Sequence, residues 1–316
     1  MTFQGVDHVG VGVGDIEEAI AFYGRHVGFD RVLFDWTGEL TGIEAFAGRA
    51  PRARVAMLES SGATPIGPGG VKLVQVLDGE GPPAAPEGQA WGEVGVCEIC
   101  LHGRNVGEVH TALVAAGCEE LMPAQSAAVL PHDIALDISY VADPWGTKLE
   151  LIEWTGLWRS LPGPARAEGV NHVAFGVTEM ARTRAFYERL GFTELLFESV
   201  DFFDPMAPWY EAPWYDPANL PAQHMTMPMA PQGAAIEPVV LDPPGPDCRG
   251  EWGHLGPMDF GIRVASIEAA RAELRADGIE VHGEPQTIDL GGGREWRSVA
   301  FAEPDGNYVS FVEARY

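Results

Sequence analysis

Several acidic and imidazole side chains stand inside segments that otherwise have the pattern of β-strands. His8 and His172 lie near the start of two alternating segments, where an imidazole is either a hydrogen-bonded structural group or a metal ligand. Glu98 lies in an otherwise apolar strand, and a carboxylate there requires a metal ion, another cation or a proton. Glu150 alternates with leucines and therefore faces the opposite side of its strand, as a ligand or as a solvent-facing group. Imidazoles and carboxylates together are ligands for divalent transition metals.

The elements that carry the two histidines occur twice in the chain. The strand pattern at Asp7–Val13 is followed by a helical pattern at Asp15–Tyr23, and the same order returns at Asn171–Val177 and Glu179–Tyr187. Alternation of apolar residues predicts the strands, and spacing of three to four residues predicts the helices. The shared order indicates an internal repeat.

A weaker copy of the same unit lies inside each half. Glu98–His102 leads into a helical pattern, and Asp259–Arg263 leads into another at Ile267–Ala276. Both copies close with turns at Asp143–Gly146 and Glu303–Asn307, where proline followed by glycine or asparagine favours a tight turn. A final strand follows each turn. The chain therefore has the pattern of four βαβββ modules.

Linkers rich in glycine and proline separate these modules and set the expected domain boundaries. They lie at Asp78–Gly88, Gly156–Gly169 and Asp242–Gly250. We expect a first module pair at residues 1–156, with modules at about 1–80 and 90–155. A linker at residues 157–168 and a second module pair at residues 169–316 follow, with modules at about 169–242 and 254–316. Pairing of the second module with the third stays open.

This fourfold order resembles the vicinal-oxygen-chelate superfamily of glyoxalases, bleomycin resistance proteins and extradiol dioxygenases. The resemblance rests on a strand-initial histidine, a helix with Phe-Tyr before Leu-Gly-Phe, and an Asp-Pro-x-Gly turn before the last strand. It covers nearly the whole chain. It implies an α+β fold, in which four βαβββ modules pair into two cup-shaped mixed-sheet domains. In that superfamily the concave face of a cup holds a divalent metal ion.

The resemblance also implies where metal ligands come from, namely the start of each module's first strand and the middle of its last strand. On the first strands these positions are His8, Glu98, His172 and Asp259, and on the last strands they are Lys72, Glu150, Glu237 and Ser310. The favoured ligand set, from the first two modules, is His8, Glu98 and Glu150. A second, weaker set is His172, Glu237 and Asp259. Pairing of the two middle modules would instead combine Glu98, Glu150, His172 and Glu237.

Lys72 departs from the pattern of ligands. It is either an ordinary surface residue or the group that neutralises a site without metal. The metal at an intact site would be Fe, Mn, Co, Ni or Zn.

Three functions follow from the resemblance. The first is a metal-dependent isomerase, epimerase or lyase that chelates vicinal oxygens of a small substrate, with Glu98 and Glu150 as candidate catalytic bases. The second is an Fe(II) extradiol-type dioxygenase, which requires two histidines and one carboxylate. The second histidine is missing, because Glu98 and Asp259 stand at the corresponding positions. The third is a metal-free protein that binds a small molecule such as a drug.

Composition limits the partners. The 46 acidic and 20 basic residues give a net charge of −26, which disfavours nucleic acid and anionic membranes. The N-terminal segment has no signal-peptide pattern and no apolar run has the length of a membrane helix, so we expect a cytoplasmic protein. The expected partner is a small-molecule substrate. Exposed sheet edges favour a homodimer.

Three further features have weaker interpretations. Cys97 and Cys100 form a C-x-x-C pattern, but on a strand they face opposite sides, which favours reduced packing residues. His132 and Asp133 are either an acid–base pair or an exposed hairpin tip. The aromatic, proline-rich stretch Asp201–Met229, which includes His224, is typical of a loop over a pocket or an interface.

Overall fold

The computed structural model describes residues 2–62, 69–79, 81–83, 85–86, 88–129, 134–155, 163–201, 222–242, 244–276, 278–279, 281 and 283–316. His132, Asp133 and residues 202–221 of the aromatic stretch lie outside these ranges. Among the helices of the described ranges, none combines the length and the hydropathy needed to cross a membrane.

The first and second modules each contain a strand, a helix and three further strands. The first consists of β1 (Phe3–Gly12), α1 (Ile16–Phe22), β2 (Arg31–Glu39), β3 (Arg52–Glu59) and β4 (Gly70–Val76). It also has a π-helical turn η1 (Tyr23–Val27), a 3₁₀ turn η2 (Thr41–Ile43) and a short helix α2 (Glu44–Ala47). The second consists of β5 (Gly95–Arg104), α3 (Val106–Ala115), β6 (Glu119–Val129), β7 (Ile134–Ala142) and β8 (Lys148–Trp154).

The third and fourth modules repeat this order. The third consists of β9 (Arg166–Gly176), α4 (Met180–Arg189), β10 (Glu194–Asp201), β11 (Ala222–Met229) and β12 (Ala235–Asp242). The fourth consists of β13 (Gly256–Val264), α6 (Ile267–Ala276), β14 (Gln286–Gly291), β15 (Arg294–Ala302) and β16 (Tyr308–Arg315). The α+β fold with four βαβββ modules is confirmed.

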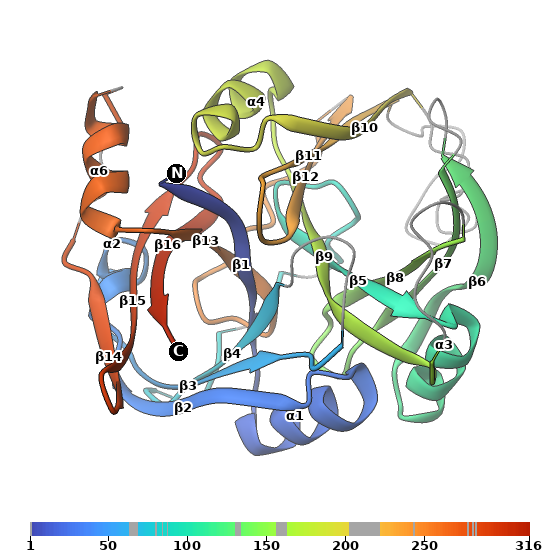
Figure 1. Ribbon diagram of the computed structural model, residues 1–316, viewed down its shortest axis with the longest axis horizontal. Coiled ribbons are helices and arrows are strands. Elements are labelled where there is room, and N and C mark those ends of the chain that lie inside the picture. The colour runs from blue at the N-terminus through green and yellow to red at the C-terminus, as the bar shows by residue number, and fades with distance from the viewer. Residues whose placement is uncertain are drawn as a thin grey trace.

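The strands form two eight-stranded mixed sheets that lie side by side (Figure 1). The outer-module sheet combines modules 1 and 4 in the order β14-β15-β16-β13-β1-β4-β3-β2. The inner-module sheet combines modules 2 and 3 in the order β10-β11-β12-β9-β5-β8-β7-β6. In each sheet the two modules meet through antiparallel first strands, β1 with β13 and β5 with β9.

This arrangement corrects the expected pairing of modules within residues 1–156 and within residues 169–316. The strands of module 1 pair with those of module 4 instead. The physical reason is that all four first strands have similar apolar alternation, so local pattern does not select a partner. The choice depends on contacts between segments far apart in the chain.

Alternation along the strands divides their side chains between two environments. One large apolar core is shared by both sheets, and Phe175 of β9 stacks on Phe260 of β13 there with ring centroids 5.1 Å apart. Two smaller apolar clusters lie on the other faces, one in each cup. Leu149 and Leu151 belong to the shared core, so Glu150 between them faces the cup of the inner-module sheet.

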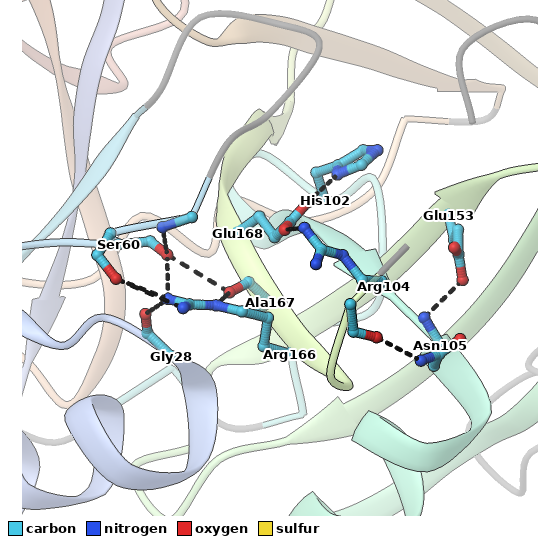
Figure 2. A network of polar contacts seen from close by, with 12 residues as sticks. Gly28, Ser60, His102, Arg104, Asn105, Glu153, Arg166, Ala167 and Glu168 are labelled. Atoms are coloured by element: carbon cyan, nitrogen blue, oxygen red, sulfur yellow. Dashed lines mark hydrogen bonds and ion pairs between the residues drawn. The ribbon is translucent and has the colours of Figure 1, made fainter. Parts of the chain in front are cut away.

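Polar contacts also connect the two sheets. Arg166 of β9 donates hydrogen bonds to the Gly28 carbonyl at 3.2 Å and to Ser60 Oγ at 3.0 Å, both in module 1 (Figure 2). Beside it, the buried Glu168 carboxylate accepts a hydrogen bond from Arg104 of β5. The Arg166 contacts connect the inner-module sheet to module 1, and the Arg104–Glu168 contact connects β5 to β9.

A buried tyrosine directly follows α1 in module 1, and another lies in the last turn of α4 in module 3. The Tyr23 hydroxyl donates a hydrogen bond of 2.7 Å to Asp143 Oδ2, in the turn before β8. The other oxygen of Asp143 accepts from the backbone N–H groups of Trp145 and Thr147, which fixes that turn. Tyr187 is the equivalent residue of module 3, and its hydroxyl has no hydrogen-bond partner among the described residues.

This difference predicts unequal effects of the same substitution. Tyr23→Phe should lower the free energy of unfolding by about 1–3 kcal/mol, because it removes a donor from a buried carboxylate. The matched control Tyr187→Phe should change it by less than about 0.5 kcal/mol or raise it. Urea unfolding of the two variants measures both values. Equal losses in the two variants would contradict the role given to the Asp143 contact.

Candidate metal centre

Four adjacent strands of the inner-module sheet bring ionisable side chains to one face. Residues that pair across the neighbouring strands β12, β9, β5 and β8 form rows that cross the sheet. One row contains Glu237, Ala174 and Glu98, and the next contains His172, Cys100 and Glu150. The rows are two residues apart along β9 and β5, so their side chains share a face. The small side chains of Ala174 and Cys100 occupy the middle positions and leave the centre open to the longer ones.

The longer side chains converge on one point. His172 Nε2 lies 3.4 Å from Glu98 Oε1, 3.3 Å from Glu150 Oε2 and 3.5 Å from Glu237 Oε2. All four residues are buried. Glu98 Oε1, Glu150 Oε2 and His172 Nε2 make no hydrogen bond, although buried polar atoms are nearly always paired. Two groups of possible ligand atoms share His172, one with Glu98 and Glu237 and the other with Glu150 and Cys100, and such donors fit a divalent metal ion.

Neighbouring groups hold these side chains in place. Trp91 Nε1 donates to Glu98 Oε2 at 2.7 Å, and His172 Nδ1 contacts Asn171 Oδ1 at 2.9 Å. The Cys100 thiol and the Tyr140 hydroxyl hydrogen-bond to Glu150. Such partners orient metal ligands in proteins.

The sequence prediction did not include these supporting residues. Cys100 was interpreted only as a packing residue, and all four cysteines are indeed free and buried. One signal was present in the sequence. A Trp-Gly pair stands seven residues before Glu98 and again before Asp259, and both tryptophans, Trp91 and Trp252, donate to those carboxylates.

The pKa shifts show that the carboxylates and the imidazole share protons. Burial, reinforced by the Glu150 charge, raises the pKa of Glu98 to about 7. Burial also raises the pKa of Glu237 to about 8, despite the nearby His172. Burial alone would lower the pKa of His172, but the surrounding glutamates raise that pKa well above its ordinary value.

Glu150 behaves differently from the other two glutamates. Burial would raise the pKa of Glu150, but the adjacent His172 imidazole, together with Cys100 and Tyr140, lowers it. Glu150 is therefore held as a carboxylate. Glu98 and Glu237 are the two glutamates of the cluster that can carry a proton near neutral pH.

The structure brings together one of the three ligand sets considered above. Glu98, Glu150, His172 and Glu237 form the cluster, which is the set from modules 2 and 3. The favoured set is not assembled, because His8 lies on β1 in the outer-module sheet.

The second, weaker set is divided for the same reason. His172 and Glu237 lie in the inner-module cup, whereas Asp259 lies on β13 of the other sheet. There the Lys72 ammonium contacts Asp259 Oδ2 at 2.9 Å, and Lys72 is buried rather than on the surface.

Comparison with known families agrees with this fold. The family model described as the Glyoxalase/Bleomycin resistance protein/Dioxygenase superfamily matches residues 5–151 and 169–311. The chain belongs to this superfamily. No curated protein matches the chain.

Solved structures of superfamily members share the fold at low sequence identity. Glyoxalase I from Zea mays superimposes with a TM-score of 0.55 and 15% identity, over 98% of this chain and 92% of that one. A mutant of that enzyme gives a TM-score of 0.59 with 15% identity over the same shares. A candidate dioxygenase from Bacillus subtilis subsp. subtilis str. 168 gives 0.59 with 11% identity, over 100% of this chain and 86% of that one. At these identities the likeness establishes the fold alone.

The raised pKa values predict how pH affects the metal-free protein. His172, Glu98 and Glu237 all bind protons more tightly when folded, so the folded state holds more protons than the unfolded chain. The free energy of unfolding should therefore fall as pH rises from about 5, above the ordinary glutamate value, to about 9, above the folded value of Glu237. Thermal unfolding of chelator-treated protein across this range measures the trend.

The variant Glu237→Gln isolates the contribution of the cluster from that of other groups. In this variant, the melting temperature should fall less steeply as pH rises above about 5. In the wild type, added divalent metal should make the same fall less steep. Ser310→Ala, in the other cup, serves as the control and should keep the wild-type slope. If Glu237→Gln leaves the slope unchanged, the raised glutamate pKa is wrong.

Proposed function

We propose that the inner-module cup is the active site of a metal-dependent isomerase or lyase that acts on a small substrate with adjacent oxygen atoms. The observation that supports this most is the position of His172 Nε2, within 3.5 Å of carboxylate oxygens from three different strands. The proposed metal ligands are Glu98, Glu150, His172 and Glu237. A bound divalent metal would act as a Lewis acid that polarises a substrate carbonyl.

The residues around the ligands would keep the site ordered. Asn171 fixes the His172 ring by accepting from Nδ1–H, which leaves Nε2 directed at the carboxylates. Trp91 holds one oxygen of Glu98 and leaves Oε1 toward the centre. The apolar cluster that surrounds the cup excludes water and strengthens electrostatic contacts within it.

Glu237 is the carboxylate best suited to move a proton. Among the described residues, the polar partner of its side chain is His172, whereas Glu98 and Glu150 are also held by hydrogen-bond donors. In the metal-free protein, burial raises the pKa of Glu237 to about 8, which shows that its surroundings tolerate the protonated form. We propose that Glu237 removes a proton from the hydroxyl-bearing carbon beside the substrate carbonyl and returns it to the carbonyl carbon, while the hydroxyl proton passes to the carbonyl oxygen. Glu98 is the second candidate base, and Glu150 is assigned as a ligand only.

An extradiol-type dioxygenase is less well supported. That chemistry uses two histidines and one carboxylate on iron. His172 is the one histidine in the ligand groups that the described residues form. The isomerase or lyase is favoured because its proton transfer requires a carboxylate base, and this site has three glutamates.

The homodimer also remains a proposal. Both sheets end in strands that pair on one side only within the described chain, which are β2 and β14 in one sheet and β6 and β10 in the other. Such edges are available to a second copy.

Metal content tests which cup holds the ion. Elemental analysis of the wild type should give about one divalent ion per chain. His172→Ala should lower metal affinity by more than about 100-fold, because even changes to residues that only support ligands cost 10–100-fold. His8→Ala is the matched control in the other cup and should retain the metal. Loss of metal in His8→Ala and retention in His172→Ala would reverse the assignment.

Proton exchange tests the reaction class. The wild type should exchange a substrate C–H for deuterium in D₂O when given α-hydroxy ketones, without consuming O₂. Glu237→Gln should reduce kcat by about 10²–10⁴-fold, the range attributed to a general base, while elemental analysis still finds metal. O₂ consumption with catechols in the wild type would instead identify a dioxygenase.

A further inference from the structure

Cys100 differs from the residue at the equivalent position of the other sheet. Its row in the inner-module cup runs from His172 through Cys100 to Glu150. In the outer-module cup, the corresponding face of the outer-module sheet, the same position is Gly261, which pairs with His8. A β-carbon at Gly261 would come within 2.4 Å of the His8 ring, so this position leaves little room for a side chain. A cysteine here therefore places its sulfur atom beside the histidine and the glutamate of its row.

The sulfur atom lies close enough to both neighbours to share a metal ion with them. Cys100 Sγ, a carboxylate oxygen of Glu150 and a ring nitrogen of His172 all lie within 4.8 Å of one another. His172 Nε2 is 3.3 Å from Glu150 Oε2. Ligand atoms around a four-coordinate zinc ion lie roughly 3–4 Å apart, because the ion–ligand distances are about 2.0–2.3 Å. Movements of about 1 Å or less would therefore allow the three atoms to coordinate one ion.

Two of these three residues have an unpaired polar atom. Glu150 Oε2 and His172 Nε2 are buried and make no hydrogen bond, and Cys100 is buried as well. Unpaired polar atoms are rare in protein interiors, and a thiol is only a weak donor. A metal ion held by sulfur, nitrogen and oxygen would pair all three groups.

The cluster contains a second group of ligand atoms without sulfur. Glu98, His172 and Glu237 also lie within 4.8 Å of one another, and the two groups share His172 alone. Oxygen-rich groups suit Mn²⁺, whereas a thiolate with an imidazole suits Zn²⁺. The chemical nature of the ion therefore decides whether the sulfur is used.

We propose that Cys100 is a further ligand of the metal centre, and that a thiophilic ion such as Zn²⁺ or Co²⁺ binds to Cys100, Glu150 and His172. An ion that prefers oxygen, such as Mn²⁺, binds to the glutamates and His172 without the sulfur. This proposal rests on the metal centre proposed above and specifies which of its atoms hold which ion. Three protein ligands leave a further position open, as catalytic zinc sites do.

Coordination changes the protonation of the thiol. Burial and the nearby Glu150 charge raise the pKa of Cys100, so the metal-free protein holds a neutral thiol. A metal ion deprotonates a coordinating thiol outright, and the proton passes to solvent. The ion itself therefore forms the thiolate.

Co²⁺ reports directly on a thiolate ligand. Titration of the full-length, chelator-treated protein with Co²⁺ should produce an intense near-ultraviolet charge-transfer band from sulfur to cobalt. Cys100→Ser keeps a hydrogen-bonding group of similar size, and should still bind Co²⁺ but lose this band. Cys97→Ser is the matched control on the same strand, equally buried but outside both ligand groups, and should keep the band. A band that persists in Cys100→Ser or disappears in Cys97→Ser would overturn the proposal.

The wild-type spectrum separates this proposal from the metal centre itself, and it decides the proposal even where a variant does not fold. Weak d–d bands without the charge-transfer band would mean that Co²⁺ binds without a thiolate, which overturns the ligand role of Cys100 alone. Absence of Co²⁺ binding would overturn both proposals.

Metal preference gives a second readout, which a purely structural role of Cys100 would not change. Cys100→Ser should weaken Zn²⁺ binding by about 100-fold or more, because a ligand is lost. It should change Mn²⁺ binding by less than about threefold, because the oxygen-rich group is intact. Cys100→Ala should show the same preference without a hydroxyl. Equal losses for the two ions would indicate a general disturbance of the cup and overturn the proposal.

Discussion

Strand register is the constraint on which both cups depend. Side chains on a strand alternate between two faces, so a slip of one residue exchanges the faces. Ile236 and Leu151 lie in the shared core, and the adjacent Glu237 and Glu150 consequently face the cup. A slip in β12 or β8 would place a carboxylate in that core, which is costly without a partner. The apolar residues thus fix the position of the polar ones.

Charge balance then decides what each cup can hold. Three glutamates surround one imidazole in the inner-module cup, and one positive charge cannot neutralise three negative ones. Burial, together with this repulsion, raises the pKa of Glu98 to about 7 and that of Glu237 to about 8, and the protons they hold relieve part of the repulsion. A divalent cation relieves it more completely. In the outer-module cup, Lys72 and Asp259 balance each other without an ion.

The sequence was informative wherever function depends on local alternation. Glu98 and Glu150 could be assigned to the cup face, and the repeat assigned His172 and Glu237 to strand positions that face the same cup, although no tight turn marks the start of the strand of Glu237. The pairing of modules could not be predicted, because it is decided by packing between distant strands with similar patterns. The supporting contact from Trp91 was missed for another reason: Trp91 lies outside the strands, so alternation says nothing of it, and its signal was the Trp-Gly pair repeated before Asp259.

The two histidines show how one fold supports two chemistries. Each is oriented through Nδ1 by the preceding residue, Asn171 for His172 and Asp7 for His8. Asn171 adds no charge, so the state of His172 follows the glutamates, and without metal its pKa is raised. Asp7 would also favour a protonated ring, but burial and the Lys72 charge lower the pKa of His8. The same backbone therefore places an imidazole among three carboxylates in one cup and an imidazole beside a buried lysine in the other.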